Sequence, residues 1–405
     1  MPPFRIEGET MAKLRKDLKE NTVLAHAGRD PRGNHGIVNP PVYHASTVLF
    51  PSVKAMEESG KDPYSGVRYG RYGTPTTFAF EEAVAALDGA ERCVQVSSGQ
   101  AAITCALLAF LKAGDHLLMT DSCYGPTRRF CDQYLARFGV EVTYYDPLIG
   151  GGIAALMRPN TRVVYLESPG SITFEVQDVP AIAKVARAAG AKVLLDNTWA
   201  SGLFFKPFEK GADIAIYAAT KYIVGHSDAM LGAITMRQAD FHAVKHSAML
   251  LGNSGGPDDC FLGLRGIRTI GVRMRQHQEN ALAIARWLQD RPEVSRVLYP
   301  ALPQDPGHAV WARDFTGASG LLGFVLTSTS KRGVDSMLDG MELFGMGFSW
   351  GGFESLILPE NLSGARTATA WTEKGSLIRV HIGLEDTDDL TKDLERGFAR
   401  LKANE

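Results

Sequence analysis

The chain has 405 residues, of which 22% are charged and 45% hydrophobic, with a formal net charge of −2 and a pI of about 6.6. A chain of this length predicts two or three domains and a sizeable core. The near-zero charge provides no overall positive field for nucleic acid or anionic lipid, and the composition excludes a disordered, collagen-like or coiled-coil protein.

The sequence pattern of the N-terminus, the length of the apolar stretches and the cysteine usage together predict a reducing compartment. Residues 1–21 carry charges throughout and lack the apolar core of a signal peptide. The longest apolar stretch, residues 101–111, is far shorter than the ~18 residues that a membrane span needs. The five cysteines are an odd number and form no C-x-x-C pair, which argues against a disulfide framework or a zinc knuckle. We therefore expect a cytoplasmic protein that binds neither membrane nor nucleic acid.

In the first half of the chain, regular apolar periodicity begins near residue 75. Residues 1–63 predict a loop-rich N-terminal arm, with several prolines and little periodicity. Beyond it, apolar residues at helical spacing end at Asp88, and short apolar runs then alternate with helical patterns. We expect strands at residues 93–96, 116–120, 140–145, 163–166, 193–195 and 214–217, and helices at residues 100–111, 128–138 and 179–189. This alternation is typical of a mostly parallel sheet that is covered on both faces.

The pattern after about residue 264 predicts a second domain. A long helical stretch at residues 271–290 leads to strand-like runs at 294–298 and 320–326. The chain ends in an amphipathic helix that places Leu390, Leu394, Phe398 and Leu401 on one face. We therefore predict an α/β protein with an arm at residues 1–63, a central domain at 64–263 and a smaller α+β domain at 264–405.

Polar residues follow the ends of the predicted strands, where open parallel sheets bind their ligands. These residues are Ser97–Gly99, Asp121–Tyr124, Glu167–Ser168, Asp196–Asn197 and Thr220–Lys221. Together they would bring an anion site, an aromatic ring, a carboxylate and a lysine to one edge of the sheet. This combination suggests a cofactor that carries both a phosphate and an aromatic ring.

Each of these features also fits an ordinary structural role. The loop Ser97–Gln100 opens a helix whose free N–H groups favour an anion, yet it also fits a plain strand-to-helix turn. Lys221 follows an apolar strand. Its amine could lose its proton there and attack a carbonyl, or its side chain could simply extend from the strand end into solvent. Asp196 could keep a pyridine nitrogen protonated, or it could form an Asx turn or a helix N-cap.

Three runs of residues, Asp196–Ala200, Ala219–Tyr222 and Gly225–Met230, resemble the pyridoxal-phosphate (PLP) enzymes of cysteine and methionine metabolism. The likeness extends from about residue 22 to the C-terminus, and within the family it is greatest to the cystathionine β-lyases. The resemblance implies the PLP-dependent transferase-like fold, also called aminotransferase fold type I. It also implies pyridoxal 5′-phosphate as the cofactor and a small amino acid as the substrate.

The resemblance further implies roles for individual residues around the cofactor. Lys221 would bond covalently to PLP and later move the Cα proton, while Asp196 would pair with the pyridine nitrogen and Tyr124 would stack on the ring. The phosphate ligands would be Gly99, Gln100 and Thr220, joined by Tyr69 and Arg71 from a neighbouring subunit. The expected assembly is therefore a homotetramer, a dimer of dimers with shared sites. Tyr124 could instead be a core tyrosine, and Tyr69 and Arg71 could lie in a solvated loop.

On the substrate side, the resemblance implies that Arg379 holds the substrate carboxylate. Ser349 would place the lysine or the substrate, and Trp350 would line the substrate site. Two of these residues also fit purely structural roles: Arg379 could pair at the surface with Glu385 or Asp386, and Trp350 could be a core aromatic. We expect no metal site, because His242 and His246 are four residues apart without the carboxylate of a zinc-binding H-E-x-x-H motif.

The resemblance favours one reaction within the family. Trp350, Pro126 and Ala218 stand where relatives that act at Cγ usually carry other residues, and all three favour β-elimination. We expect cleavage of L-cystathionine to L-homocysteine, pyruvate and ammonia, as in methionine biosynthesis, by a PLP-dependent carbon–sulfur lyase. Tyr72 stands where the β-lyases carry a second arginine, so other cysteine S-conjugates are further candidate substrates. The alternatives are a methionine γ-lyase, a cystathionine γ-synthase, or a non-catalytic regulatory protein on the same fold.

Overall fold

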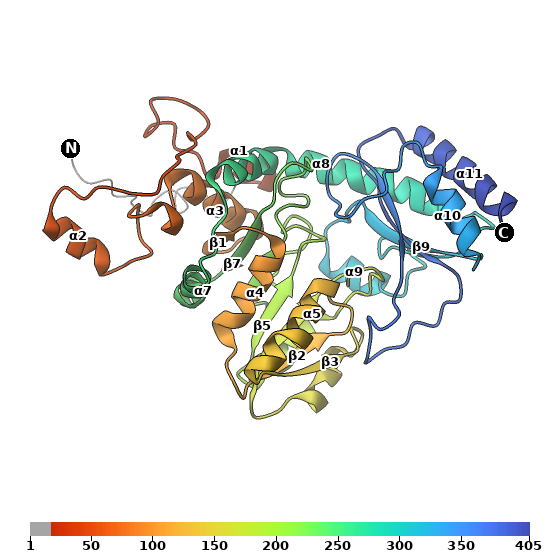
Figure 1. The fold of residues 1–405 in the computed structure, drawn as a ribbon, viewed down its shortest axis with the longest axis horizontal. Coiled ribbons are helices and arrows are strands. Elements are labelled where there is room, and N and C mark those ends of the chain that lie inside the picture. The colour runs from red at the N-terminus through yellow and green to blue at the C-terminus, as the bar shows by residue number, and fades with distance from the viewer. Residues whose placement is uncertain (1–17) are drawn as a thin grey trace.

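The structure is a computed structural model that describes residues 18–405, so the first 17 residues of the predicted arm lie outside the described residues. Two sheets organise the molecule (Figure 1). The larger sheet has seven strands in the order β1-β7-β6-β5-β4-β2-β3, and the smaller sheet has four in the order β10-β11-β9-β8. The predicted class, a mostly parallel central sheet with a smaller C-terminal α+β part, is confirmed.

The elements have the following bounds. The strands of the larger sheet are β1 (Arg92–Val96), β2 (His116–Thr120), β3 (Glu141–Tyr145), β4 (Thr161–Glu167), β5 (Lys192–Asp196), β6 (Ile214–Tyr217) and β7 (Gly232–Met236). The strands of the smaller sheet are β8 (Val294–Leu298), β9 (Leu321–Leu326), β10 (Leu356–Glu360) and β11 (Leu377–His381). The α-helices are α1 (Glu20–His26), α2 (Val53–Gly60), α3 (Pro75–Asp88), α4 (Gly99–Phe110), α5 (Gly125–Gln133), α6 (Val179–Ala188), α7 (Gln238–Leu250), α8 (Pro257–Gln289), α9 (His308–Asp314), α10 (Lys331–Asp339) and α11 (Thr387–Ala403). Short 3₁₀ helices cover Gly70–Tyr72, Leu135–Phe138 and Gly150–Leu156.

Strand direction in the larger sheet determines where a ligand can bind. Strand β7 pairs antiparallel with both β1 and β6, while the other neighbouring strands pair in parallel. Strand β1 therefore runs in the same direction as β6, and every strand except β7 ends at one edge of the sheet. The loops after these strands meet at that edge.

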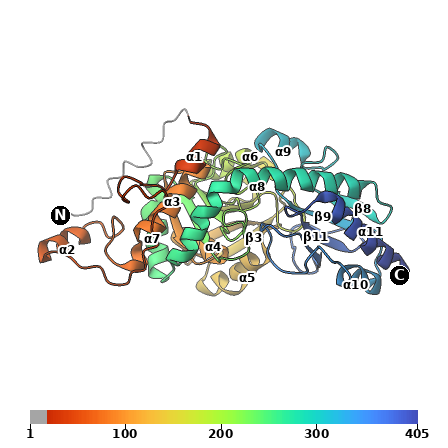
Figure 2. The same ribbon diagram turned by 90° about the horizontal axis from the view of Figure 1, so that it is seen from above.

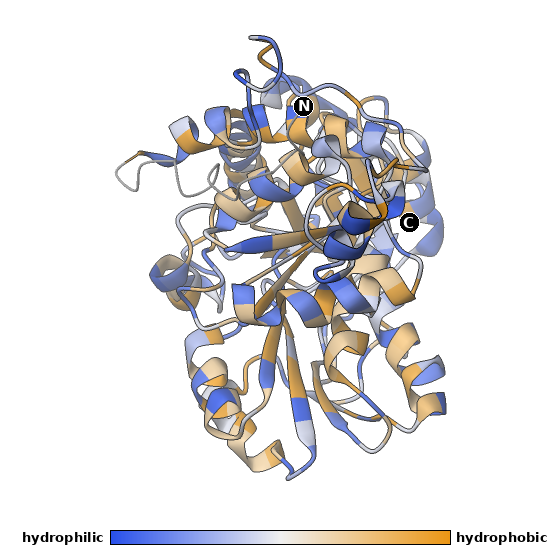
Figure 3. Ribbon diagram, turned by 90° about the vertical axis from the view of Figure 1, so that its left-hand side faces the viewer, coloured by the Kyte–Doolittle hydropathy of each residue, from blue (hydrophilic) through white to orange (hydrophobic). Residues whose placement is uncertain are grey.

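The larger sheet is buried on both faces because successive side chains along a strand point to opposite sides. In β5, Val193 and Leu195 belong to the core that includes α3, α6 and α8, whereas Leu194 belongs to the core beneath α4, α5 and α7. Figure 3 shows hydrophobic and hydrophilic residues alternating along the covering helices, as expected for helices with one buried side. This explains why the strands appear in the sequence as short continuous apolar runs.

Local sequence signals fix several helix ends. Thr74 caps α3 through a reciprocal capping box with Thr77, and Gly89 ends the helix with a φ of +76°. Asp178 caps α6, since its carboxylate accepts the N–H of Ala181.

Helix α8 joins the two sheets. It has 33 residues and packs against α3 of the larger domain and against β8, β9 and α11 of the C-terminal part. Figure 2 shows it running along the molecule from the α3 and α7 region to the smaller sheet. The helix begins at Pro257, earlier than the expected residue 271, and the proposed boundary at residues 263–264 falls inside it. Gly266 lies so close to the turn after β6 that a Cβ would collide with the carbonyl oxygens of Ile223 and Val224.

The described part of the N-terminal arm contains two short helices that the sequence pattern did not indicate. Helix α1 packs against α3 and α8, whereas α2 buries none of its residues and projects away from both sheets (Figures 1 and 2). Leu49 and Val53, beside and within α2, are 88% and 67% exposed. Among residues 18–405, no helix has the length and apolar character needed to cross a membrane.

Candidate functional site

A cavity of about 350 Å³ opens at the carboxyl edge of the larger sheet and extends to the C-terminal domain. The predicted site residues that line it are Gly99, Gln100, Tyr124, Asp196, Thr220, Lys221, Ser349, Trp350 and Arg379. Loops far apart in the sequence thus converge on one space, as the strand order requires. Tyr69 and Arg71 are not among the residues that line this cavity.

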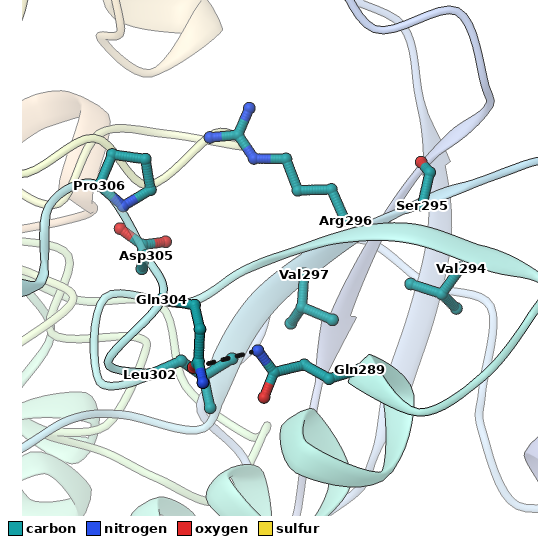
Figure 4. A pocket seen from close by; sticks show the side chains of 9 residues that line it. All are labelled: Gln289, Val294, Ser295, Arg296, Val297, Leu302, Gln304, Asp305 and Pro306. Carbon is teal, nitrogen blue, oxygen red and sulfur yellow. Dashed lines mark hydrogen bonds between the residues drawn. The ribbon is translucent and has the colours of Figure 1, made fainter.

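Other hollows lack this combination of groups. Figure 4 shows a hollow of about 230 Å³ beside β8, where Arg296 and Asp305 are the charged side chains. A groove of about 780 Å³ along β10 and α10 is lined by Lys331, but that side chain is 86% exposed and pairs with Asp335. Neither surface encloses a buried amine, so we assign the site to the cavity at the sheet edge.

Lys221 lies in the turn that follows β6, with its amine inside the cavity. Its Nζ donates a hydrogen bond to Oγ of Ser349 over 2.6 Å and lies 5.2 Å from the centre of the Trp350 ring. Burial and the nearby Arg379 guanidinium lower the pKa of Lys221 to about 8, although the Asp196 carboxylate opposes this shift. A lysine with such a pKa is uncharged in about a tenth of molecules at pH 7, far more than an ordinary lysine, and only the uncharged amine is a nucleophile or a base.

Asp196 ends β5 and is only 8% exposed. Its Oδ1 accepts hydrogen bonds from the N–H of Thr198 at 3.0 Å and from Oγ1 of Thr198 at 2.6 Å. The bond to the N–H two residues ahead is the Asx turn considered from the sequence, and the same carboxylate also lines the cavity. Burial raises the pKa of Asp196, while the Thr198 hydrogen bonds act in the opposite direction.

Thr198 was not identified from the sequence, although it supports two of the site loops. Its Oγ1 donates to Asp196 and also accepts the N–H of Ala218 at 3.0 Å, which ties the end of β5 to the end of β6. The sequence signal was present, because a threonine two residues after a strand-end aspartate can bond the carboxylate. Its second partner is distant in the sequence and could be found only in the structure.

The backbone of Tyr124 is positioned by the partly buried carboxylate of Glu167. The N–H of Tyr124 donates to Oε2 of Glu167 at 2.7 Å, and the tyrosine side chain lines the cavity. Tyr124 is 44% exposed, so it is not a core tyrosine. Burial and the nearby Asp196 carboxylate raise the pKa of Glu167 well above its usual value. The sequence placed Glu167 at the correct sheet edge but assigned it no role.

The N-terminus of α4 forms an anion-binding end of the cavity. Ser98 caps this 12-residue helix through the N–H of Ala101, and within residues 18–405 the N–H groups of Gly99 and Gln100 have no acceptor. Oε1 of Gln100 is also buried without a hydrogen-bond partner in the described chain. A Cβ on Gly99 would lie 2.5 Å from Cβ of Ala218, so only glycine permits this close packing. Thr220 lines the same cavity.

These groups fit pyridoxal 5′-phosphate. The free N–H groups suit its phosphate, a buried carboxylate suits its protonated ring nitrogen, and an exposed aromatic side chain suits its flat ring. The lysine with a lowered pKa suits its carbonyl group. Each requirement is met by a different loop of the same cavity.

Arg379 enters the cavity from β11 of the smaller sheet. Its side chain is 16% exposed, and its Nε lies 3.4 Å from Oε1 of Glu360. The surface pairs considered from the sequence are therefore wrong: the Glu385 carboxylate accepts from Ser355, and Asp386 caps α11. A guanidinium on the wall of a half-buried cavity can bind a carboxylate through two parallel hydrogen bonds.

Tyr69 and Arg71 lie elsewhere on the chain. Arg71 donates to the carbonyl oxygen of Met249, and Tyr69 is 44% exposed. The nearby ring of Tyr72 has the guanidinium groups of Arg68 and Arg71 at 5.7 and 5.1 Å from its centre. These residues form a basic, aromatic surface that is separate from the cavity of the same chain.

The two histidines four residues apart lie on α7. His242 and His246 stack on each other and pack around Tyr64, whose hydroxyl lies 2.6 Å from Nδ1 of His246. Within the described residues, 18–405, no group of three or more metal-binding side chains is present.

Comparisons with known proteins also indicate a PLP-dependent enzyme, and they match most of the chain. The family model for the Cys/Met metabolism PLP-dependent enzymes matches residues 21–399. A putative cystathionine beta-lyase of Rhizobium johnstonii is 51% identical over 387 residues, covering 95% of this chain and 96% of the relative. The cystathionine beta-lyase MetC of Escherichia coli is 45% identical over 392 residues, covering 95% of this chain and 99% of that relative.

A solved structure is also closely similar. The cystathionine gamma synthase from Xanthomonas oryzae pv. oryzae, in complex with aminoacrylate and cysteine, superposes with a TM-score of 0.87 at 33% sequence identity. The match covers 95% of this chain and 99% of that structure. The fold of PLP-dependent enzymes of this type is thereby shown.

Proposed function

Because the chain belongs to the family of Cys/Met metabolism PLP-dependent enzymes, we propose that it cleaves L-cystathionine to L-homocysteine, pyruvate and ammonia. It is a PLP-dependent enzyme, and the relatives named as β-lyases are more similar to it than the γ-synthase structure is. The observation that carries the proposal is the position of the Lys221 amine, which lies beside Ser349 and Trp350 in a cavity that also contains Arg379.

The cofactor is held by groups from several loops. When bound, pyridoxal 5′-phosphate supplies an electron sink for the electron pair that remains when the Cα proton leaves. Gly99, Gln100 and Thr220 bind its phosphate, and Asp196 keeps its ring nitrogen protonated. Tyr124 provides an aromatic face, and its backbone is fixed by the Glu167 carboxylate.

Lys221 and Arg379 act on the substrate. Arg379 binds the α-carboxylate through its planar guanidinium and so presents Cα to the Lys221 amine. Lys221 removes the Cα proton, a task that suits an amine whose pKa is about 8. The hydroxyl of Ser349 accepts a hydrogen bond from that amine and restricts its orientation.

Loss of the Cα proton leads to cleavage at Cβ. The Cβ–S bond breaks, and the sulfur leaves with the bonding electrons as a thiolate, which gains a proton to become homocysteine. The remaining three-carbon enamine takes up one water molecule and yields pyruvate and ammonia. Since Tyr72 stands where the β-lyases carry a second arginine, we propose that the distal half of the substrate is weakly selected and that other cysteine S-conjugates are accepted.

The test is the product pattern from L-cystathionine with the purified, PLP-loaded protein. We expect pyruvate and homocysteine in equal amounts, with no pyruvate from the Lys221→Ala variant. Cysteine with 2-oxobutyrate would show a γ-acting enzyme instead. A protein without the yellow colour of bound PLP, unchanged by Lys221→Ala, would show a non-catalytic relative.

The proposed assembly is a homotetramer, a dimer of dimers in which Tyr69 and Arg71 complete the site of a neighbouring subunit. Two observations support it. The cations that line the cavity are Lys221 and Arg379, so the described chain places no basic side chain at the α4 end for a phosphate. In addition, the apolar side chains beside and within α2 are exposed in the single chain and suit burial against another copy. Sedimentation analysis would distinguish a tetramer from a dimer or a monomer.

The proposed location is the cytoplasm. All five cysteines are buried free thiols in the described structure, which suits a reducing compartment. Cell fractionation with an antibody to the protein would test the location. A role in methionine biosynthesis would be tested by rescue of a strain that requires methionine and lacks its own β-lyase.

A further inference from the structure

The turn Ser349–Gly351 has an unusual backbone conformation for a segment that touches the reacting amine. Ser349 has a φ of +81°, a region that residues other than glycine rarely occupy, and Gly351 has a φ of +87°. A Cβ on Gly351 would lie 2.9 Å from the backbone nitrogen of Tyr222, so the turn is pressed against the main chain of the catalytic lysine. Such a conformation persists only where neighbouring groups hold it in place.

A buried histidine supplies one of these holding contacts. The N–H of Gly351 donates to Nε2 of His381 at 3.2 Å, and Nδ1 of His381 lies 3.0 Å from the carbonyl oxygen of Glu354. Because one partner can only donate and the other can only accept, the proton must reside on Nδ1. His381 is 1% exposed, and its pKa lies well below the usual value, mainly because of burial and secondarily because of the nearby His277. Its Nε2 therefore remains an acceptor.

The surroundings of His381 keep its ring in this position. The rings of Tyr222, His277 and His381 lie 5.2 to 5.8 Å from one another, and the Trp350 ring lies 5.4 Å from Tyr222. On β11, His381 is two residues from Arg379, so both side chains point to the same face of the strand. A single strand thus presents the arginine of the substrate site and the histidine that holds the turn.

We propose that His381 is a positioning residue, which holds the Ser349–Gly351 turn against Lys221 through its Nε2 acceptor and so orients the amine for proton transfer. The inference rests on the proposed function of the site. His381 does not line the cavity, and it acts through Gly351 on the Ser349 hydroxyl and the Trp350 ring. Without the acceptor, the strained turn relaxes and the Ser349 oxygen moves away from Nζ of Lys221.

Two substitutions of His381 test the roles of its two ring nitrogens one at a time. In His381→Gln, the amide oxygen reaches the place of Nε2 and still accepts from Gly351. In His381→Asn, the amide lies at the place of Nδ1, so the donor to Glu354 is kept and the acceptor for Gly351 is lost. The matched control is His277→Asn, which removes a ring from the same cluster but keeps a donor for the carbonyl oxygen of Ile382.

We expect kcat for pyruvate release from L-cystathionine to fall on the order of 10- to 100-fold in His381→Asn, with KM unchanged, because the turn is displaced by about an ångström. His381→Gln and His277→Asn should both retain kcat to within a few fold, because each keeps an acceptor for the N–H of Gly351. A second readout does not depend on turnover. In cofactor-free protein, the pH midpoint for covalent capture of added PLP should fall in His381→Asn, since the charged Lys221 amine loses its Ser349 acceptor.

Equal kcat and equal capture midpoints in His381→Asn and the wild type, for folded protein, would overturn the proposal. Equal loss in His381→Asn, His381→Gln and His277→Asn would show a packing role rather than a positioning role and would also overturn it. Failure of the proposed function is recognised separately, because the wild type itself would then release no pyruvate from L-cystathionine.

Discussion

The carboxylate of Asp121 accepts the backbone N–H of Thr369 at 2.8 Å, which links the end of β2 in the larger sheet to a loop of the C-terminal domain. The same carboxylate accepts the N–H groups of Thr367 and Ala368 and pairs with Arg128 at 2.5 Å. Asp121 is three residues before Tyr124, so this contact between domains also anchors the loop that carries the aromatic residue of the site.

The first prediction concerns this contact. Asp121→Ala should lower the free energy of unfolding by about 3–5 kcal/mol, because it leaves Arg128 charged, buried and unpaired. The comparison is Asp335→Ala, which breaks the exposed pair with Lys331 and should cost less than about 1 kcal/mol. Urea denaturation of both variants measures the difference, and equal stabilities would contradict a structural role for Asp121.

The pH dependence of this contact has a definite sign. Burial alone would raise the pKa of Asp121, but the hydrogen bonds from Thr367 and Thr369 and the Arg128 pair outweigh burial and lower it. The contribution to stability is therefore complete above the unfolded-state pKa of about 3.9 and is lost as the pH falls through the lower folded-state value. Acid titrations of stability should show that the wild type and Asp121→Ala converge below about pH 4.

The second prediction concerns the amine of Lys221. In cofactor-free protein, the rate of covalent capture of added PLP should rise with pH and level off near the pKa of about 8. An ordinary lysine amine would continue to gain reactivity up to about pH 10. The growth of the yellow absorption band after mixing measures the rate at each pH. A midpoint near that of a free lysine would show that the amine is not desolvated.

The third prediction concerns the recognition of the substrate carboxylate. Arg379→Lys keeps the charge but loses the planar fork, so kcat/KM for L-cystathionine should fall on the order of 10- to 100-fold, mainly through KM. Arg396→Lys serves as a control, because Arg396 is half exposed on α11. An unchanged KM in Arg379→Lys would show that the carboxylate is bound elsewhere.

The fourth prediction concerns the shared site. Arg71→Ala and Lys221→Ala should each be inactive, yet a mixture that has been unfolded and refolded together should recover about a quarter of the wild-type activity. In a twofold-symmetric pair, half of the dimers are mixed, and each mixed dimer contains one intact site. Recovery confined to the co-refolded sample is the expected outcome, and no recovery in verified mixed oligomers would refute sharing.

Strong local signals made much of the fold predictable. The runs at residues 116–120, 214–217 and 294–298 coincide with β2, β6 and β8, because apolar runs flanked by turn residues suit buried strands. The helix expected at residues 128–138 was only partly right. Helix α5 begins at Gly125 and ends at Gln133, and a separate 3₁₀ turn follows.

The strands β7, β10 and β11 were not predicted from the sequence, because their local sequence signals are weak. Strand β7 begins at a glycine, and β10 and β11 contain a proline or an arginine within their apolar pattern. The polar residues at the strand ends could be grouped correctly, since strand direction alone brings them together. The contacts of Thr198 with Ala218 and of His381 with Gly351 could not be predicted, because each joins segments 20 or more residues apart.

Helix α8 constrains how the molecule can move. At 33 residues it is about 50 Å long, and it packs against α3 of the larger domain and against β8 and β9 of the smaller sheet without a proline in its interior. A rotation of one domain about a hinge would have to bend this helix, so we expect access to the cavity to depend on loop motions rather than on domain rotation. For the same reason the two sheets should melt in a single cooperative transition, with the amide protons of the central turns of α8 exchanging only on global unfolding.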